Sequence, residues 1–178
     1  MLAKVSAPHT FNDTVALAPY RAPLVRACIH EAKFARNERA IALLGQLLGE
    51  YLNATFPHET KSDIHLVPIP LSEQRLRERG YNQVLEITYS ARPRARHIHI
   101  HETLLQKIRH TPSQTSLTRS ERLQNLNGVF AVGEHAVPLT AHLILFDDVV
   151  TTGTTLAEAA RALTRAGFTH IDQLALAH

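Results

Sequence analysis

The chain has 178 residues and is poor in the residue types that mark several classes of protein. Cys28 is its only cysteine, which excludes an internal disulfide and any metal site built from several cysteines. Tryptophan is absent and only 6% of the residues are aromatic, so the stacking platforms of many nucleic-acid-binding proteins are not expected. No apolar run is long enough to span a membrane, and MLAKVSAPHTFND lacks the apolar segment of a signal peptide. We therefore expect a cytoplasmic protein with no membrane partner.

The sequence also lacks two common nucleotide-binding motifs. The chain contains neither G-x-x-x-x-G-K-[ST] nor G-x-G-x-x-G, which excludes a P-loop and a dinucleotide fingerprint. No internal repeat or long linker divides it, and its 44% hydrophobic content is enough to bury a core. We predict a single domain over residues 1–178. The formal net charge of +3 suits polyphosphate ligands but identifies no partner.

The most informative segment that is present is LILFDDVVTTGTTL, residues 143–156. Its apolar start predicts a parallel strand buried on both faces. This strand brings Asp147 and Asp148 to its carboxyl end, where ligands bind in open α/β sheets. A hydroxyl-rich loop with Gly153 follows, and then a helical pattern that Gly167 ends. The alternative is an ordinary strand, turn and helix that carries two acids by chance.

This order of features indicates a site for a ribose 5-phosphate. A phosphate in the loop would meet backbone N–H groups and the positive end of the helix dipole. The two carboxylates would accept hydrogen bonds from the 2- and 3-hydroxyls of the sugar. The pattern resembles the signature of type I phosphoribosyltransferases, which bind phosphoribosyl pyrophosphate (PRPP).

Apolar periodicity along the chain predicts strands that alternate with helices. Such alternation is typical of an α/β protein with a mostly parallel sheet flanked by helices. We predict an N-terminal helical part over residues 1–62 and a ligand-binding core over 63–178. Helical patterns lie within residues 19–52 and 82–90, and strand patterns at residues 64–67, 97–101, 104–108, 129–132 and 171–177. Residues 109–127 are polar with few core positions, which is typical of a functional loop such as a lid.

Three arginines follow the first strand of the core. Arg75, Arg77 and Arg79 lead into the step Gly-Tyr-Asn-Gln at residues 80–83. The planar guanidinium matches phosphate oxygens, so Arg77, Arg79 and this step are candidates for binding pyrophosphate. Arg75 is interpreted as part of a solvated charge run. For the other two arginines, a solvated run before a helix is the weaker alternative.

The segments VPIPLSEQRLRERGYNQ, KIRHTPSQTSLTRSERLQNLNGVF and LILFDDVVTTGTTL together resemble the three-part pattern of the ComF family. This family comprises competence-associated phosphoribosyltransferase-like proteins and includes the GntX group. The resemblance implies a type I phosphoribosyltransferase fold, a mostly parallel sheet flanked by helices with a flexible hood near residues 104–132. Many members begin with a cysteine-rich zinc ribbon, for which this chain has no cysteines.

The resemblance also implies roles for individual residues. Asp147 and Asp148 would be catalytic and would hold the ribose hydroxyls, with Mg²⁺ nearby bound mainly through substrate and water. The 5-phosphate would be bound by Thr151, Thr152, Gly153, Thr154 and Thr155. Pyrophosphate would be bound by Pro68, Ile69, Pro70, Leu71, Arg77 and Arg79. The hood would carry Lys107, Arg109, Gln114 and Arg122, although Arg122 and Asn125 could equally anchor its return.

The implied reaction transfers phosphoribosyl to a nitrogenous acceptor and releases pyrophosphate. The acceptor is not identified by the sequence, and a homodimer is possible. The alternative function is non-catalytic: sensing of PRPP or a nucleotide, or handling of single-stranded DNA in competence and DNA uptake. Arg92, Arg94 and Arg96 could touch nucleic acid in that case, although a Pro-containing surface turn between helix and strand is the simpler explanation for them.

Three histidines at alternate positions, His97, His99 and His101, would share one face of a strand. Such a row could in principle bind a metal ion. No cysteine or carboxylate on that face completes a site, because Glu102 points to the other face. We therefore interpret the three histidines as solvated residues at a sheet edge.

Overall fold

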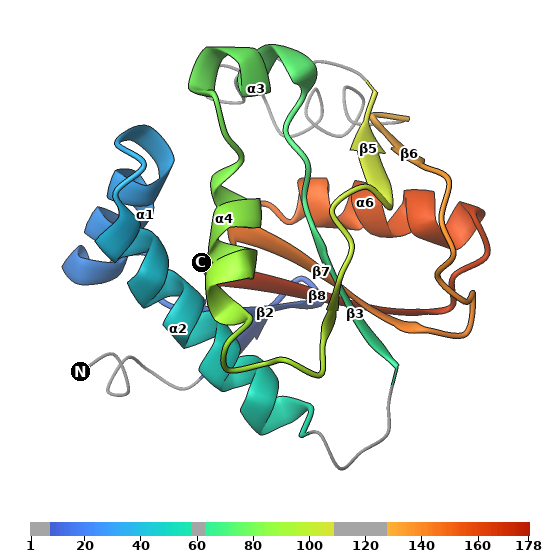
Figure 1. The fold of residues 1–178 in the computed structure, drawn as a ribbon, viewed down its shortest axis with the longest axis horizontal. Coiled ribbons are helices and arrows are strands. Elements are labelled where there is room, and N and C mark those ends of the chain that lie inside the picture. Colours follow the sequence, from blue (N-terminus) through green and yellow to red (C-terminus); the bar gives the residue numbers. More distant parts are fainter. Residues whose placement is uncertain (1–7, 58–62, 109–127) are drawn as a thin grey trace.

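The sheet at the centre of the molecule is mostly parallel (Figure 1), as seen in a computed structural model that describes residues 8–57, 63–108 and 128–178. Its strand order is β1-β2-β8-β7-β3-β4, and only the β1–β2 pair is antiparallel. These strands are β1 (His9–Phe11), β2 (Thr14–Ala18), β3 (Ile64–Pro68), β4 (His99–Ile100), β7 (His142–Val149) and β8 (His170–Ala177). The predicted α/β class is confirmed.

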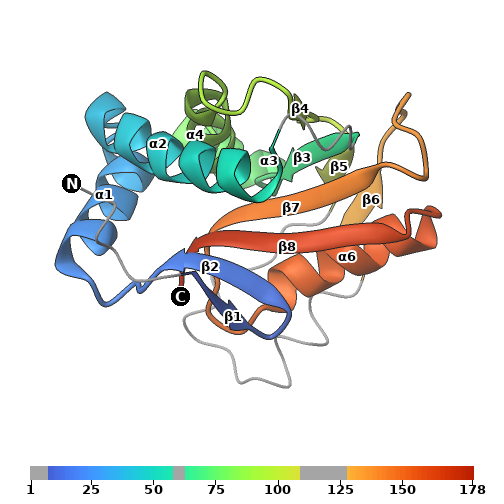
Figure 2. The same cartoon turned by 90° about the horizontal axis from the view of Figure 1, so that it is seen from below.

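Helices cover both faces of this sheet. Figure 2 shows α1 (Pro23–Phe34), α2 (Glu38–Thr55) and α4 (Gln83–Ala91) on one face and α6 (Thr154–Arg165) on the other. The strand β7 is buried between these layers. Its Ile144 and Phe146 pack with α1, α2 and α4, while Leu143 and Leu145 pack with α6. The continuous apolar run at the start of β7 therefore has the two buried faces that the sequence predicted.

Close packing of α2 against α4 depends on glycine. A Cβ atom built on Gly45 would lie 2.5 Å from the Cβ of Ser90, and one on Gly49 would lie 2.8 Å from the carbonyl oxygen of Ala91. These distances are too short for any larger residue, so the two helices approach each other directly through their backbones. Hydrophobic residues of both helices continue this contact into the core below.

A short helix, α3 (Glu73–Arg79), connects β3 to α4 and was not predicted as a helix. The Ser72 side chain caps its first turn by accepting a hydrogen bond from the N–H of Arg75. Gly80 ends it with φ of 79°, a left-handed conformation that suits glycine. Asn82 then caps α4 by accepting from the N–H of Val84. Charged residues dominate α3, which left no apolar period to detect.

The N-terminal part is not wholly helical, which corrects the prediction for residues 1–62. The strands β1 and β2 form a hairpin whose turn residues Asn12 and Asp13 have positive φ angles of 45° and 62°, as tight hairpin turns require. Strand β2 then adds to the main sheet by pairing in parallel with β8. The two strands are too short to show a periodic pattern, and they are defined by the pairing of β1 with β2 and of β2 with β8.

The predicted strands at residues 104–108 and 129–132 are confirmed. They form a separate antiparallel ribbon of β5 (Leu105–Lys107) and β6 (Phe130–Val132). Of the predicted hood residues, Lys107 lies on β5. Arg109, Gln114 and Arg122 lie outside the described residues, as does Asn125. In the described part of the chain, no helix is both long and apolar enough to cross a membrane.

Candidate functional site

The acid pair lies near the carboxyl end of β7, between β3 and β8. Strand β7 extends to Val149, past the predicted end of the strand, because β8 pairs with it as far as Ala177. Asp147 lines a cavity together with the loop that follows the strand and the first turn of α6. All five residues predicted to bind a 5-phosphate contribute to the lining of this cavity: Thr151, Thr152, Gly153, Thr154 and Thr155.

The loop between β7 and α6 turns sharply at Gly153 and leads directly into the helix. Gly153 precedes α6 with φ of 74°, a left-handed conformation that few other residues adopt readily. Among the residues that the structure describes, no side chain caps this helix, so its first N–H groups can meet an anion. The hydroxyls of Thr152 and Thr154 lie 2.9 Å apart and share a hydrogen bond. The side-chain amide of Asn12, from the β1–β2 turn, donates to the Thr152 carbonyl at 3.4 Å.

The two acids have different surroundings. Asp148 is only 5% exposed; its Oδ1 accepts from the N–H of Val149 and its Oδ2 from the side-chain amide of Gln83, both at 2.8 Å. The Nζ of Lys33 lies 3.8 Å from the same Oδ2. Asp147 is half-buried, and its Oδ1 accepts from the N–H of Asp148 at 2.8 Å. Asp148 is therefore satisfied by the protein, whereas Asp147 faces the cavity.

Burial raises the pKa of Asp147 to about 7, and the negative charge of Asp148 adds to this effect. The hydrogen bond from the Asp148 backbone and the positive charges of Lys33 and Lys107 act in the opposite direction. Burial also lowers the pKa of Lys107, with a further contribution from the charge of Arg75 and an opposing one from Asp147. Lys107 thus places positive charge close to Asp147, and Arg75 lies near Lys107.

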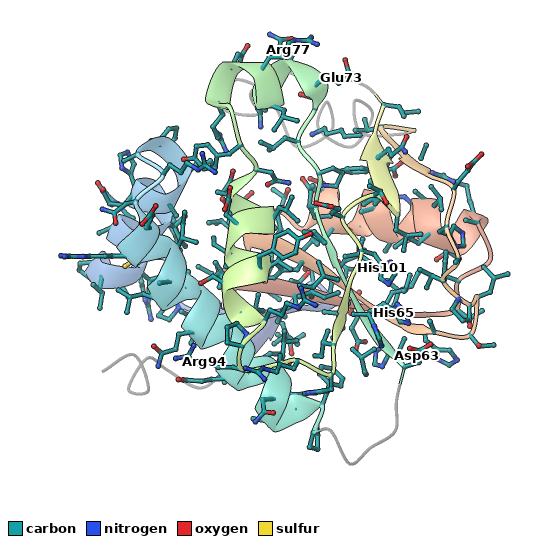
Figure 3. All side chains as sticks on the ribbon, viewed as in Figure 1. Asp63, His65, Glu73, Arg77, Arg94 and His101 are labelled. Carbon is teal, nitrogen blue, oxygen red and sulfur yellow. The ribbon has the colours of Figure 1, made fainter. Side chains whose placement is uncertain are left out.

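The structure separates the three arginines that follow β3. The Arg79 guanidinium is half-buried and donates to the side-chain oxygen of Gln83, which connects it indirectly to Asp148. Arg77 is 72% exposed and pairs with Glu73 on the outer side of α3 (Figure 3). Arg75, interpreted as a solvated charge, is half-buried and acts on Lys107. Arg79 and Arg75 therefore lie toward the site, while Arg77 points away from it.

The loop predicted to bind pyrophosphate, from Pro68 to Leu71, follows β3 at the same edge of the sheet. Its shape is fixed by Ile69, whose N–H donates to the Phe146 carbonyl at 2.9 Å and whose carbonyl accepts from the Asn82 side chain at 3.0 Å. Pro70 and Leu71 border a second cavity, which also lies against the turn between α3 and α4.

Lys33 and Asn12 reach the site from the N-terminal part and were not among the predicted site residues. Lys33 lies on α1, which packs on one face of the sheet, and Asn12 lies in the turn of the hairpin that joins the edge of the sheet through β8. No motif surrounds either residue. A helix-ending lysine and a turn asparagine are common in sequences, so no local signal identifies them.

The histidine row is divided by the structure. His99 and His101 lie beside His65 of β3, whose Nδ1 is 2.7 Å from the His101 Nε2 (Figure 3). His97 instead contacts the Phe56 carbonyl. Within residues 8–57, 63–108 and 128–178, no three His, Cys, Asp or Glu side chains are arranged to hold a metal ion. Burial and the neighbouring His65 and His99 lower the pKa of His101.

The fold and the site define an α/β protein in which an acid pair and a Thr/Gly loop lie at the carboxyl edge of a mostly parallel sheet. No protein-family model matches the chain. It is 34% identical over 164 residues to DNA utilization protein YhgH of Escherichia coli K12, which covers 90% of this chain and 69% of that protein. It is 33% identical over 122 residues to competence protein F of Haemophilus influenzae, covering 67% of this chain and 52% of that protein.

The chain therefore belongs to the ComF family, which includes these two proteins, and the predicted resemblance is confirmed. A solved structure of a hypoxanthine phosphoribosyltransferase from Staphylococcus aureus matches with a TM-score of 0.46 and 13% sequence identity. That match covers 78% of this chain and 63% of the other, which is less than two thirds of its length.

Proposed function

We propose that this chain binds PRPP with Mg²⁺ and transfers the phosphoribosyl group to a nitrogenous acceptor, with release of pyrophosphate. One observation carries the proposal. The acid pair of β7 leads directly into a Thr/Gly loop whose backbone N–H groups open a helix, and Asp147 shares one cavity with that loop. A sugar phosphate is the ligand that needs acceptors for hydroxyls and donors for phosphate at this spacing.

In this proposal, residues 151–155 bind the 5-phosphate and Asp147 accepts hydrogen bonds from the ribose hydroxyls. Residues 68–71, with Arg79, Arg75 and Lys107, supply the donors and positive charge for pyrophosphate. The donor set fits Mg²⁺, which prefers carboxylate and hydroxyl oxygens and keeps several waters. Asp147 has the carboxylate that faces the cavity, so it would be the nearest protein ligand to the ion, with Asp148 behind it.

The proposed step breaks the bond between the anomeric carbon and the pyrophosphate oxygen while a nitrogen of the acceptor attacks the carbon. Positive charge develops on the sugar and negative charge on the leaving group. The Asp147 carboxylate would stabilise the sugar, and the basic residues would stabilise the departing pyrophosphate. Bound Mg²⁺ would neutralise pyrophosphate oxygens as a Lewis acid.

A calorimetric titration with PRPP and Mg²⁺ tests binding, and pyrophosphate release across a panel of nitrogenous bases tests transfer. We expect Asp147→Asn to weaken PRPP binding by roughly tenfold or more, since hydrogen bonds to a charged group contribute about 1.5–3 kcal/mol. Asp172→Asn is the matched control, because Asp172 lies near the amino end of β8 and pairs with His142. Absence of PRPP binding by the wild type would refute the proposal; binding without release would limit it to a sensor.

The names of the relatives favour a second candidate, the handling of DNA. Arg92, Arg94 and Arg96 are exposed in the segment between α4 and β4. Figure 3 places Arg94 at the opposite end of the molecule from Arg77, so this surface would act separately from the cavity. Binding of a labelled single strand should weaken with added salt and when the three arginines are replaced. Affinity that is indifferent to these replacements would rule out this surface.

A further inference from the structure

Asp148 is held by two helices that cover one face of the sheet. Lys33, in the last turn of α1, places its Nζ 3.8 Å from the Asp148 Oδ2. Gln83, the first residue of α4, donates its amide to the same oxygen at 2.8 Å. The other carboxylate oxygen accepts from the backbone of Val149. Asp148 therefore has partners on both of its oxygens and is 5% exposed.

The alternation of side chains along β7 explains why only one acid has these partners. Successive residues of a strand point to opposite faces. Asp148 continues the row of Ile144 and Phe146, which packs with α1, α2 and α4. Asp147 continues the row of Leu143 and Leu145, which packs with α6, and it lines the cavity that leads to the first turn of that helix.

The orientation of the Gln83 amide is fixed as well. Its oxygen accepts from the Arg79 guanidinium, so its NH₂ group must be the part that faces Asp148. The Arg79 guanidinium in turn lies 5.7 Å from the ring centre of Phe34, close enough for a cation–π interaction. Phe34 directly follows Lys33, so α1, α3 and α4 meet around a single carboxylate.

We infer that Lys33 is a positioning residue that, with Gln83, clamps Asp148 from the helical side of the sheet. The clamp fixes the Asp148 carboxylate, which in turn fixes the Val149 N–H and the start of the phosphate loop. It leaves Asp147 as the acid that meets the sugar and its metal ion. Lys33 is 33% exposed in its side chain and contributes its charge from outside the predicted motifs. The expected effect of Lys33 on PRPP binding rests on the proposed function, whereas the positioning of Asp148 by Lys33 and Gln83 does not.

The first test measures PRPP affinity in the presence of Mg²⁺ by calorimetry for Lys33→Met and Lys33→Arg. We expect the methionine variant to bind about ten- to a hundredfold more weakly, and arginine to restore affinity to within a few fold. Arg26→Met is the matched control, since Arg26 is an exposed cation on the same helix. Equal losses in Lys33→Met and Arg26→Met, or no rescue by arginine, would overturn the positioning role.

The second test needs no ligand and separates the clamp from the proposed function. In NMR spectra of the free protein, Lys33→Met should shift the side-chain NH₂ signals of Gln83 and speed hydrogen exchange at the Val149 amide. Arg26→Met should leave both unchanged. If Lys33→Met changes neither, the clamp is wrong whatever PRPP does. If both change and the wild type fails to bind PRPP, the clamp stands and the proposed function fails.

Discussion

Replacing Asp147 by asparagine should make the protein more stable at alkaline pH while it impairs PRPP binding. Asparagine has nearly the same shape, and its side-chain oxygen can still accept the N–H of Asp148 that Asp147 Oδ1 accepts at 2.8 Å. The substitution removes only the negative charge that burial and Asp148 disfavour. A residue that reduces stability and faces a cavity is typical of a functional site.

The magnitude follows from the pKa of Asp147, which is raised from 3.8 to about 7 in the folded protein. At about 1.4 kcal/mol per pKa unit, this shift corresponds to an upper limit of about 4 kcal/mol at pH 8. Asp147 is only half-buried, so solvent screening reduces this figure, and we expect about 2 kcal/mol. The folded state binds the proton more tightly, so wild-type stability falls as the pH rises from about 4 to 7.

Urea denaturation followed by circular dichroism at several pH values between 5 and 8 measures this effect. The free energy of unfolding of Asp147→Asn should exceed that of the wild type most at pH 8 and by a smaller amount at pH 5. Asp13→Asn is the control, because it removes the same charge from an exposed turn. A gain for Asp147→Asn that does not depend on pH, or a loss at pH 8, would refute this explanation.

Three further predictions concern the surroundings of the site and the core. Asn12→Ala removes the donor to the Thr152 carbonyl. Calorimetry should show PRPP binding weakened roughly tenfold, while the free energy of unfolding changes by only about 1 kcal/mol. Unchanged affinity would exclude a role for the hairpin turn in binding. The pKa of His101 is lowered in the folded state by burial and by His65 and His99. The unfolded chain therefore binds the proton more readily, and the free energy of unfolding should fall from pH 7 to pH 5. In urea titrations, His101→Gln should reduce this dependence of the unfolding free energy on pH, and an unchanged dependence would contradict the explanation. Gly45→Ala should lower the unfolding free energy by about 1–3 kcal/mol, because the new Cβ would lie 2.5 Å from that of Ser90. In thermal melts, adding Ser90→Gly to this variant should restore part of the lost stability. A Gly45→Ala variant as stable as the wild type would show that α2 and α4 can move apart at no cost in stability.

Much of the fold could be predicted because it depends on local periodicity. The apolar run of β7, the helical period of α2 and the glycine before α6 are all visible in short windows of sequence. The hairpin of β1 and β2 could not be found in this way. Its strands have three and five residues, and what makes β2 part of the sheet is pairing with β8 at the other end of the chain.

For the site, the sequence by itself determined that two acids follow a buried strand and precede a Thr/Gly loop and a helix. The acids face opposite sides of the sheet because β7 continues through both of them to Val149, and the sequence did not predict this extension. Only the tertiary structure decided what each acid meets. Gln83 reaches Asp148 across 65 positions and Asn12 reaches Thr152 across 140, and Lys33 arrives on a helix from the N-terminal part. Such contacts depend on how the elements pack in space, which the spacing of residues along the chain does not encode.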